Sequence, residues 1–299
     1  MSFIAGAGLT NIDLLYTGVE RIPDIGEEVY SKGFELQLGG GLPATLINLS
    51  RLGVPVKLAT ELGHDMFSDF AMAEFEKYGI TPLNLYRSDG IPVNITSAII
   101  LKDDRSFVTY GKGGIEPDND AVERFYNMSH GSKITLMQCG GFLEAYRKLH
   151  DEGTTLVFDT GWDDELSVAK YREYLEIADY YTPNKKEALK ITNTNTPEEA
   201  LNVLDKFFEK PVVKLDKDGC IGKEDGRQIY IKSIDVNCVD STGAGDAFLA
   251  GFAYGLFTDS PFEKCLLYGN ITGGNCVTKA GALTANITAN ELHQLAREV

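Results

Sequence analysis

The feature that most constrains this chain is residues 240–246, DSTGAGD, which lead directly into a proline-free apolar run at 247–252. Two glycines around an alanine allow a tight turn, because glycine tolerates backbone angles and close approaches that larger residues avoid. An apolar run after such a turn predicts a buried helix. The first turn of a helix has unpaired N–H groups and the positive end of the helix dipole, so we expect an anion-binding turn.

Asp246 stands beside this turn. A carboxylate there repels a resting phosphate, but it suits a reaction in which a hydroxyl group loses its proton while attacking one. In this interpretation the N–H groups of Gly243, Ala244 and Gly245 stabilise the developing charge, and Asp246 accepts the proton. The alternative is a structural helix cap, because Asp is favoured at N-caps and in first turns.

The thirteen residues 240–252, DSTGAGDAFLAGF, resemble the C-terminal signature of the ribokinase/PfkB family of carbohydrate kinases. The resemblance extends over essentially the whole chain. It implies an α/β fold of three αβα layers, with a mostly parallel central sheet and a small β-sheet lid. It also implies ATP and Mg²⁺ as cofactors, together with a monovalent cation such as K⁺.

Length and charge limit the alternatives. A chain of 299 residues suits one large α/β domain or two small ones. We expect a single domain over 1–299, with lid strands inserted at about 14–38 and 91–112. A net charge of −16 argues against a basic nucleic-acid surface, and no polybasic membrane patch is visible. Five scattered cysteines without a CxxC pair, and no apolar run of about 18 residues, predict a cytoplasmic protein.

The N-terminal residues 3–8 are small and apolar, which predicts a buried first strand. Gly6 and Gly8 begin a GxGxxG pattern, but Asn11 stands at the third glycine position and no helix-like segment follows, so we reject a dinucleotide site. Asn11 and Asp13 are spaced to face the same way at a strand end, where open α/β sheets bind ligands. The resemblance implies that Asp13 binds sugar hydroxyls; the alternative is a loop cap.

Residues 28–38 alternate around Gly33, which predicts two short strands of a hairpin, and a similar pattern returns at 94–101 and 106–110. A sheet of four short strands cannot bury both faces alone. We therefore expect a lid over the site, with its other face covered by a second subunit. The resemblance implies the same lid and a homodimer formed through it.

Gly39, Gly40 and Gly41 precede a predicted helix and resemble the N-terminal GG signature of the family, where backbone approaches the sugar. Three positions depart from the pattern. Ala44 replaces the usual Asn, Gly41 stands where ribokinases have Lys, and Gly140 stands where they have Glu. Losing three polar contacts argues against ribose and favours a larger or differently hydroxylated substrate.

Asn184 and Glu187 lie three residues apart at a predicted helix start, so they share one face. A carboxylate with a neutral amide suits the outer shell of a hydrated Mg²⁺ ion, and the alternative is a capping box. Asp159 follows a predicted strand at 154–158, where the family has an aspartate with a structural or metal-linked role. Trp162 is expected to pack rather than to stack on substrate.

The resemblance places the nucleotide near residues 211–220. Lys214 and Gly219 are the candidate contacts there, whereas Asp216 replaces the usual glycine and brings negative charge close to the nucleotide. Near the signature helix, Thr242 and Asn270 are further nucleotide candidates.

The resemblance places adenine and the monovalent cation at residues 270–281, where Asn270, Cys276 and Gly281 are candidates through their side chains or carbonyls. Asp240 and Thr242 lie on the other side of the cation loop. For Asn270 the alternative is a buried, hydrogen-bonded side chain. Three basic residues are candidates to meet a substrate phosphate, or otherwise lie solvated on the surface: Arg87, Arg105 and Lys112.

The predicted reaction is ATP-dependent transfer of the γ-phosphoryl group to a hydroxymethyl group of a small sugar or sugar-like substrate other than ribose. No Walker A sequence GxxxxGK[ST] is present, so a P-loop enzyme is unsupported. Two alternatives stay open: a nucleoside kinase on the same scaffold, and a non-catalytic sensor that binds a sugar or nucleotide.

Overall fold

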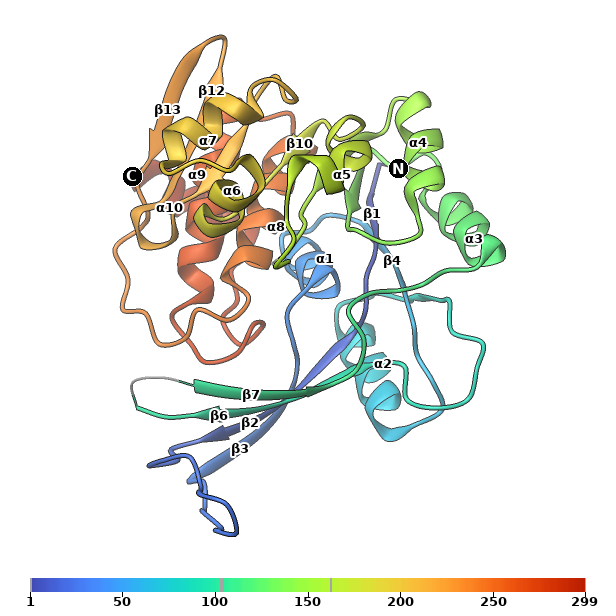
Figure 1. Ribbon diagram of the computed structural model, residues 1–299, viewed down its shortest axis with the longest axis vertical. Coiled ribbons are helices and arrows are strands. Elements are labelled where there is room, and N and C mark those ends of the chain that lie inside the picture. The colour runs from blue at the N-terminus through green and yellow to red at the C-terminus, as the bar shows by residue number, and fades with distance from the viewer. Residues whose placement is uncertain (1, 103–104, 162, 299) are drawn as a thin grey trace.

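A computed structural model describes residues 2–102, 105–161 and 163–298 (Figure 1). The expectation for Trp162 therefore lies outside the described residues. The central sheet has six strands in the order β10-β9-β8-β1-β4-β5, and every neighbouring pair is parallel. Its strands are β1 (Ile4–Ala7), β4 (Val56–Thr60), β5 (Leu83–Asn84), β8 (Ile134–Met137), β9 (Thr155–Phe158) and β10 (Tyr180–Tyr181).

Apolar side chains cover both faces of this sheet, as parallel strands require. Successive residues alternate between two hydrophobic clusters, since Leu136 and Val157 belong to one cluster, and Met137 and Phe158 to the other. The first cluster contains side chains of α1 (Leu42–Arg51), α2 (Met66–Lys77), α8 (Ala244–Phe257), α9 (Phe262–Cys276) and α10 (Ala289–Glu298). The second contains side chains of α3 (Asn119–Ser129), α4 (Leu143–Asp151), α5 (Val168–Leu175), α6 (Lys185–Thr192) and α7 (Pro197–Leu204).

The arrangement is thus a three-layer α/β fold, which confirms the predicted fold class. A three-stranded antiparallel sheet extends it, made of β11 (Val212–Lys214), β12 (Cys220–Glu224) and β13 (Arg227–Ile231). A parallel bridge between Asn184 and Lys214 brings β11 to the start of α6. A short 3₁₀ helix, η1 (Asp216–Asp218), joins β11 to β12.

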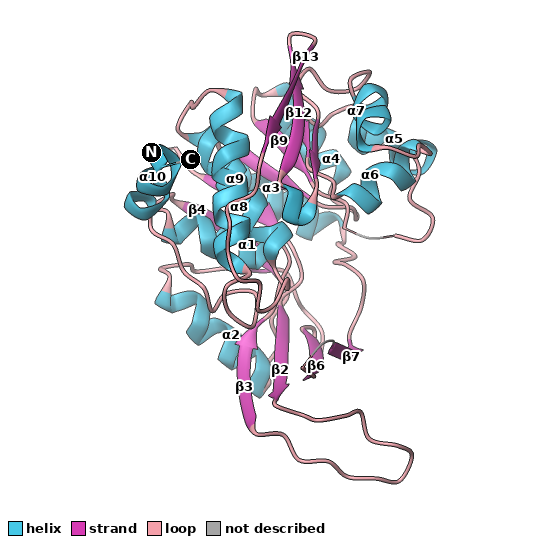
Figure 2. Cartoon of the chain, turned by 90° about the vertical axis from the view of Figure 1, so that its left-hand side faces the viewer, coloured by secondary structure: helices cyan, strands magenta, loops and turns pink. Residues whose placement is uncertain are grey.

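A separate four-stranded sheet, named the lid after the role expected for it, has the strand order β3-β2-β6-β7. Its strands are β2 (Asn11–Thr17), β3 (Gly33–Leu38), β6 (Asn94–Ile100) and β7 (Arg105–Tyr110). Figure 2 shows this sheet below the body, with the connection from β2 to β3 extending beyond it.

The expectation of a hairpin within 28–38 is wrong. β3 pairs instead with β2, from Ile12 opposite Leu38 to Thr17 opposite Gly33. The segment before β3 carries turn residues such as Pro23 and Gly26, whereas Asn11–Thr17 is a continuous apolar-rich strand that pairs on both sides.

All five cysteines are free thiols, as their scattered spacing predicts. Among the described residues, no helix combines the length and the apolarity needed to cross a bilayer.

Candidate active site

The turn that opens α8 is built around Gly243. This residue is the N-cap with φ of 76°, in the left-handed region, and a Cβ atom there would lie 2.6 Å from the Cβ of Ala282. The sequence therefore needs glycine for both conformation and space. The amide of Ala244 donates to the Ser241 carbonyl at 3.3 Å. The amides of Gly243 and Gly245 have no acceptor among the residues described, so they are the N–H groups available to an anion.

Asp246 lies in the first turn of α8 and contacts the glycine loop from the other half of the chain. Its Oδ2 accepts the N–H of Gly41 at 2.8 Å, across 205 residues of sequence. A Cβ atom on Gly40 would lie 2.7 Å from the same oxygen. Burial raises the pKa of Asp246 to about 6 and the charge of Asp159 adds to this, although Gly41 opposes the shift. A carboxylate with this pKa is an effective general base near neutral pH.

Asp13 and Asn11 both face the glycine loop from the start of β2, as their spacing predicts. The Nδ2 of Asn11 donates to the carbonyl of Gly40 at 2.9 Å, so this amide holds the loop. A Cβ atom on Gly39 would lie 2.6 Å from the Oδ1 of Asp13. The Asp13 side chain is buried, and burial followed by the charge of Asp240 raises its pKa to about 6. Within the described chain no protein donor reaches its carboxylate, which leaves both oxygens to a ligand.

Lys214 lies at the end of β11, close to the anion-binding turn. Its Nζ donates to Oδ2 of Asp159 at 3.1 Å, and a Cβ atom on Gly245 would lie 3.6 Å from that nitrogen. Burial lowers the pKa of the Lys214 ammonium, but the charges of Asp159 and Glu187 outweigh it and raise the pKa above its ordinary value. A buried ammonium group therefore lies beside the N-terminus of α8, where it adds positive charge to the turn.

Asn184 and Glu187 form the capping box of α6. The Oδ1 of Asn184 accepts the Glu187 N–H at 3.0 Å, and Oε2 of Glu187 accepts the Asn184 N–H at 2.8 Å. Burial and then the charge of Asp159 raise the pKa of Glu187. The alternative interpretation is thus realised, although it uses only one carboxylate oxygen.

The donor set at this place fits a hydrated Mg²⁺ ion. Within the described ranges, no three His, Cys, Asp or Glu side chains are grouped to hold a metal by themselves. Mg²⁺ keeps several waters and needs only one or two carboxylates beside nucleotide phosphates. Glu187 and Asp159 interact electrostatically with each other and with Lys214, so two carboxylates lie near one another at this place.

Asp240 joins two loops at the base of α8. Its Oδ1 accepts the N–H and the hydroxyl of Thr242 at 3.0 and 2.8 Å, and its Oδ2 accepts the Gly281 N–H at 2.8 Å. Arg105 of the lid forms an ion pair with the same carboxylate. Burial alone would raise the pKa of Asp240, but the hydrogen bonds from Gly281 and Thr242 and the charge of Arg105 lower it.

The remaining nucleotide candidates have structural partners. Asn270 is buried in α9, and its Nδ2 donates to the carbonyls of Ile231 and Lys232 at 2.8 and 3.3 Å. This is the alternative that the sequence left open. Gly219 ends η1 with φ of 102°, and a Cβ atom there would lie 2.1 Å from the Ile231 carbonyl oxygen. Their part in nucleotide binding stays a prediction.

Sequence reasoning missed the partners of the three basic candidates. Arg87 pairs with Asp120, Arg105 with Asp240, and Lys112 with Glu61 at 2.6 Å. It also missed Thr182, whose hydroxyl donates to Asp159 at 3.3 Å. Thr182 directly follows β10, so the rule that strand ends carry ligand-binding groups would have found it.

Comparisons with known proteins identify the family and the fold of the chain. The sequence model of the "pfkB family carbohydrate kinase" matches residues 1–289. An "Uncharacterized sugar kinase" of Archaeoglobus fulgidus is 26% identical over 249 residues, which cover 79% of this chain and 96% of that protein. The ribokinase of Bacillus subtilis is 25% identical over 314 residues, covering 99% of each chain. A putative ribokinase II from Escherichia coli, solved in complex with ATP and Mg²⁺, has the same fold, with a TM-score of 0.80 at 19% identity over 100% of each chain.

Proposed function

Since the chain belongs to the pfkB family of carbohydrate kinases, we propose that it transfers the γ-phosphoryl group of ATP to a hydroxymethyl group of a sugar or sugar-like substrate other than ribose. One observation carries the proposal. The Asp246 carboxylate, with a pKa of about 6, lies in the turn whose Gly243 and Gly245 amides are available to an anion. A base and an anion-binding turn on one helix end are what attack of an alcohol on a phosphoryl group requires.

The side chains divide the work of this reaction. Asp13 accepts hydrogen bonds from substrate hydroxyls, and the backbone of Gly39 and Gly40 lies against the carboxylates of Asp13 and Asp246. Asp246 takes the proton of the attacking hydroxyl. The amides of the α8 turn and the Lys214 ammonium stabilise the charge that develops on the transferred group, since phosphoryl transfer depends mostly on positioning and electrostatics.

The proposed Mg²⁺ site lies next to Lys214, at the carboxylates of Glu187 and Asp159. Glu187 and Asp159 would hold hydrated Mg²⁺, which supplies charge neutralisation between the nucleotide phosphates when bound. Asn184 orients Glu187 through the capping box. Lys214 keeps the two carboxylates from repelling each other in the resting protein.

The side chains at the candidate substrate positions argue against ribose and for a neutral acceptor. Gly41, Ala44 and Gly140 offer no side-chain polar atoms where ribokinases have Lys, Asn and Glu. The cations that could meet a substrate phosphate are paired with protein carboxylates, as Arg105 is with Asp240 and Lys112 with Glu61. The buried Asp13 carboxylate repels anions when it is ionised, and it accepts hydrogen bonds from hydroxyl groups. The same lack of polar side chains supports a nucleoside as the second candidate acceptor.

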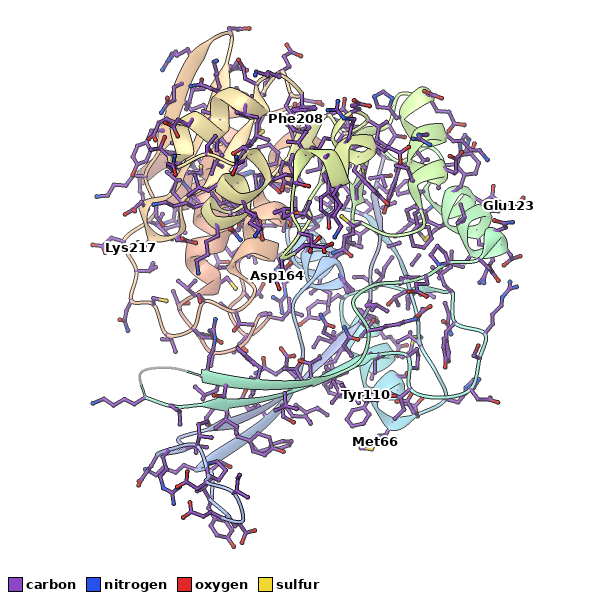
Figure 3. The ribbon with its side chains drawn as sticks, in the orientation of Figure 1. Met66, Tyr110, Glu123, Asp164, Phe208 and Lys217 are labelled. Atoms are coloured by element: carbon purple, nitrogen blue, oxygen red, sulfur yellow. The ribbon has the colours of Figure 1, made fainter. Side chains whose placement is uncertain are left out.

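The lid supports a homodimer. The pairing register puts Asp13 and Arg105 on one face of the sheet, and Phe34, Val108 and Tyr110 on the other. These three apolar side chains are 56%, 73% and 61% exposed, and Figure 3 labels Tyr110 at the end of β7. Exposed aromatic and aliphatic groups on one face of a small sheet are characteristic of a protein interface. Sedimentation analysis of Val108→Glu against wild type tests this: a monomeric wild type contradicts the dimer.

The experiment for the reaction is an ADP-coupled assay over a panel of hexoses, pentoses, sugar acids and nucleosides. At least one neutral acceptor should give turnover, and Asp246→Asn should reduce that turnover by about 10²-fold or more. Near-normal turnover in Asp246→Asn removes this residue from the role of base. Ligand-dependent thermal shifts without ATP turnover on any acceptor would favour the non-catalytic sensor.

A further inference from the structure

The oxygens around Asp240 already have protein donors. Both oxygens of this carboxylate are used, because Thr242 and Arg105 bond Oδ1 and Gly281 bonds Oδ2. The Asp240 side chain is only 7% exposed. A buried carboxylate needs a compensating charge, and the guanidinium group of Arg105 supplies it.

The neighbouring carbonyl groups are also occupied. Arg51 of α1 donates to the carbonyls of Leu283 and Ala285 at 2.7 and 3.1 Å. The thiol of Cys276 approaches the carbonyl oxygens of Thr242 and Ala282 at 3.4 and 3.5 Å, and burial raises the pKa of this thiol to about 12, so that it stays a donor. A K⁺ ion is held by several oxygens that replace its water shell. Since these oxygens face N–H, O–H and S–H groups, they do not fit a diffusible monovalent cation.

Arg105 comes from the lid rather than from the body. It is the first residue of β7, and it lies on the face of the lid sheet that also carries Asp13. Besides its ion pair with Asp240, it donates to the hydroxyl of Ser241 at 3.1 Å. In Figure 1 the start of β7 lies just below the loops of the C-terminal half. Its charge therefore reaches Asp240 only while the lid lies against the body.

We propose that Arg105 is a lid-borne cation that takes, at Asp240, the place of the monovalent cation implied by the family resemblance. Arg105 is a positioning residue, because it acts through Asp240 on the turn that binds the phosphoryl group. The proposal rests on the proposed kinase function. Closing the lid over the substrate and completing the anion-binding turn then become one event.

The contacts of Asp240 give the physical route. Asp240 holds Thr242, which precedes Gly243, and it holds Gly281, which precedes the Ala282 residue that packs on Gly243. Without a cation, the Asp240 charge would repel anions next to the turn. It would also act more strongly on Asp13, whose pKa it already raises. Removing Arg105 should therefore destabilise the transition state of phosphoryl transfer more than it weakens binding of the acceptor.

The test compares wild type, Arg105→Met and a control, Lys102→Met, which removes an exposed cation from the same hairpin. Turnover is measured with MgATP in KCl and in choline chloride of equal ionic strength. Wild type and the control should keep the same rate in both salts. Arg105→Met should lose about tenfold to hundredfold of kcat in choline, by the magnitude expected for anion-site electrostatics, with a smaller change in the KM of the acceptor. Added K⁺ or guanidinium should restore part of the loss.

A wild type that requires K⁺ would overturn the proposal, as would an Arg105→Met variant with normal kcat in choline. Thermal unfolding supplies a readout that does not depend on turnover. K⁺ should raise the Tm of Arg105→Met above its value in choline, and it should leave the Tm of wild type unchanged; equal responses would also overturn the proposal. If wild type turns over no acceptor in either salt, the proposed kinase function is wrong. The Tm comparison then still tests whether Arg105 occupies the place of a cation at Asp240.

Discussion

The substitution Gly40→Ala should displace the carboxylate of Asp246, the proposed catalytic base, and so lower kcat, although Asp246 itself is unchanged. The added Cβ atom would lie 2.7 Å from Oδ2 of Asp246, and no other atom of the surroundings except its Cγ comes within 4 Å. Carbon atoms reach favourable contact at about 3.5 Å, so either the carboxylate or the loop has to move by several tenths of an ångström. Backbone strain plays no part, since the φ of Gly40 does not lie in the left-handed region.

The carboxylate is the group that will move. Asn11 holds the carbonyl of Gly40 at 2.9 Å, so the loop is tied to β2. Asp246 is fixed to the loop through its 2.8 Å bond to the Gly41 N–H, and rotation of the carboxylate gives up that bond. A misplacement of 1 Å can cost 10²-fold in rate, and several tenths of an ångström should cost about tenfold to hundredfold in kcat. The KM for ATP should stay near its wild-type value.

Two further alanine variants sharpen the comparison. Gly39→Ala would press on Asp13 instead, with its Cβ atom 2.6 Å from Oδ1, and should act mainly through the KM of the acceptor. Gly113→Ala is the matched control, because its Cβ atom would meet nothing within 4 Å. Steady-state kinetics in the ADP-coupled assay separates the three variants. A Gly40→Ala enzyme with wild-type kcat, or one that behaves like Gly39→Ala, would refute this reasoning.

The pKa values of Asp246 and Asp13 are both raised to about 6, so kcat/KM should fall as the pH drops through 6. Protonated Asp246 cannot take the proton of the attacking hydroxyl, and protonated Asp13 loses its charge and one of its acceptor oxygens. The fall should be steeper than one proton allows, and Asp13→Asn should reduce it to a single-proton limb in a pH–rate profile. Lys214→Met should move the limb of Asp246 to higher pH, since the Lys214 charge lowers that pKa; an unmoved limb would contradict the interaction. Glu187→Gln should keep the capping bond to Asn184 and hence the Tm, while raising the KM for MgATP; a lower Tm with unchanged KM would make Glu187 purely structural.

The parts of the fold that local pattern determines were predictable. Short apolar strands such as Ile134–Met137 and Thr155–Phe158 are buried on both faces, which only a covered parallel sheet provides. The turn before α8 was equally predictable from sequence. Gly243 has φ of 76° and lies against Ala282, and such a position accepts little besides glycine. In each case the information lies within about fifteen residues of the element that it specifies.

Strand pairing in the lid was less predictable. The alternation at 28–38 predicts strand structure, but only Gly33–Leu38 forms a strand, and it pairs with β2. The choice depends on tertiary packing, since Ile12 and Leu38 are both buried in the core that lies behind the lid. A hairpin predicted from residues 28–38 alone could not take into account that β2 is an alternative pairing partner.

The electrostatics of the site needed the structure for a different reason. Arg105 and Asp240 are separated by 135 residues, and Asp246 and Gly41 by 205. An interaction between charges depends on their distance in space and on the solvent around them, neither of which is encoded near either residue. Residues defined by their place on their own strand or helix, such as Asp13 and Asp246, could therefore be named from sequence. The role of Arg105 is defined by a partner, and it follows only once the lid is seen lying against the loop that carries Asp240.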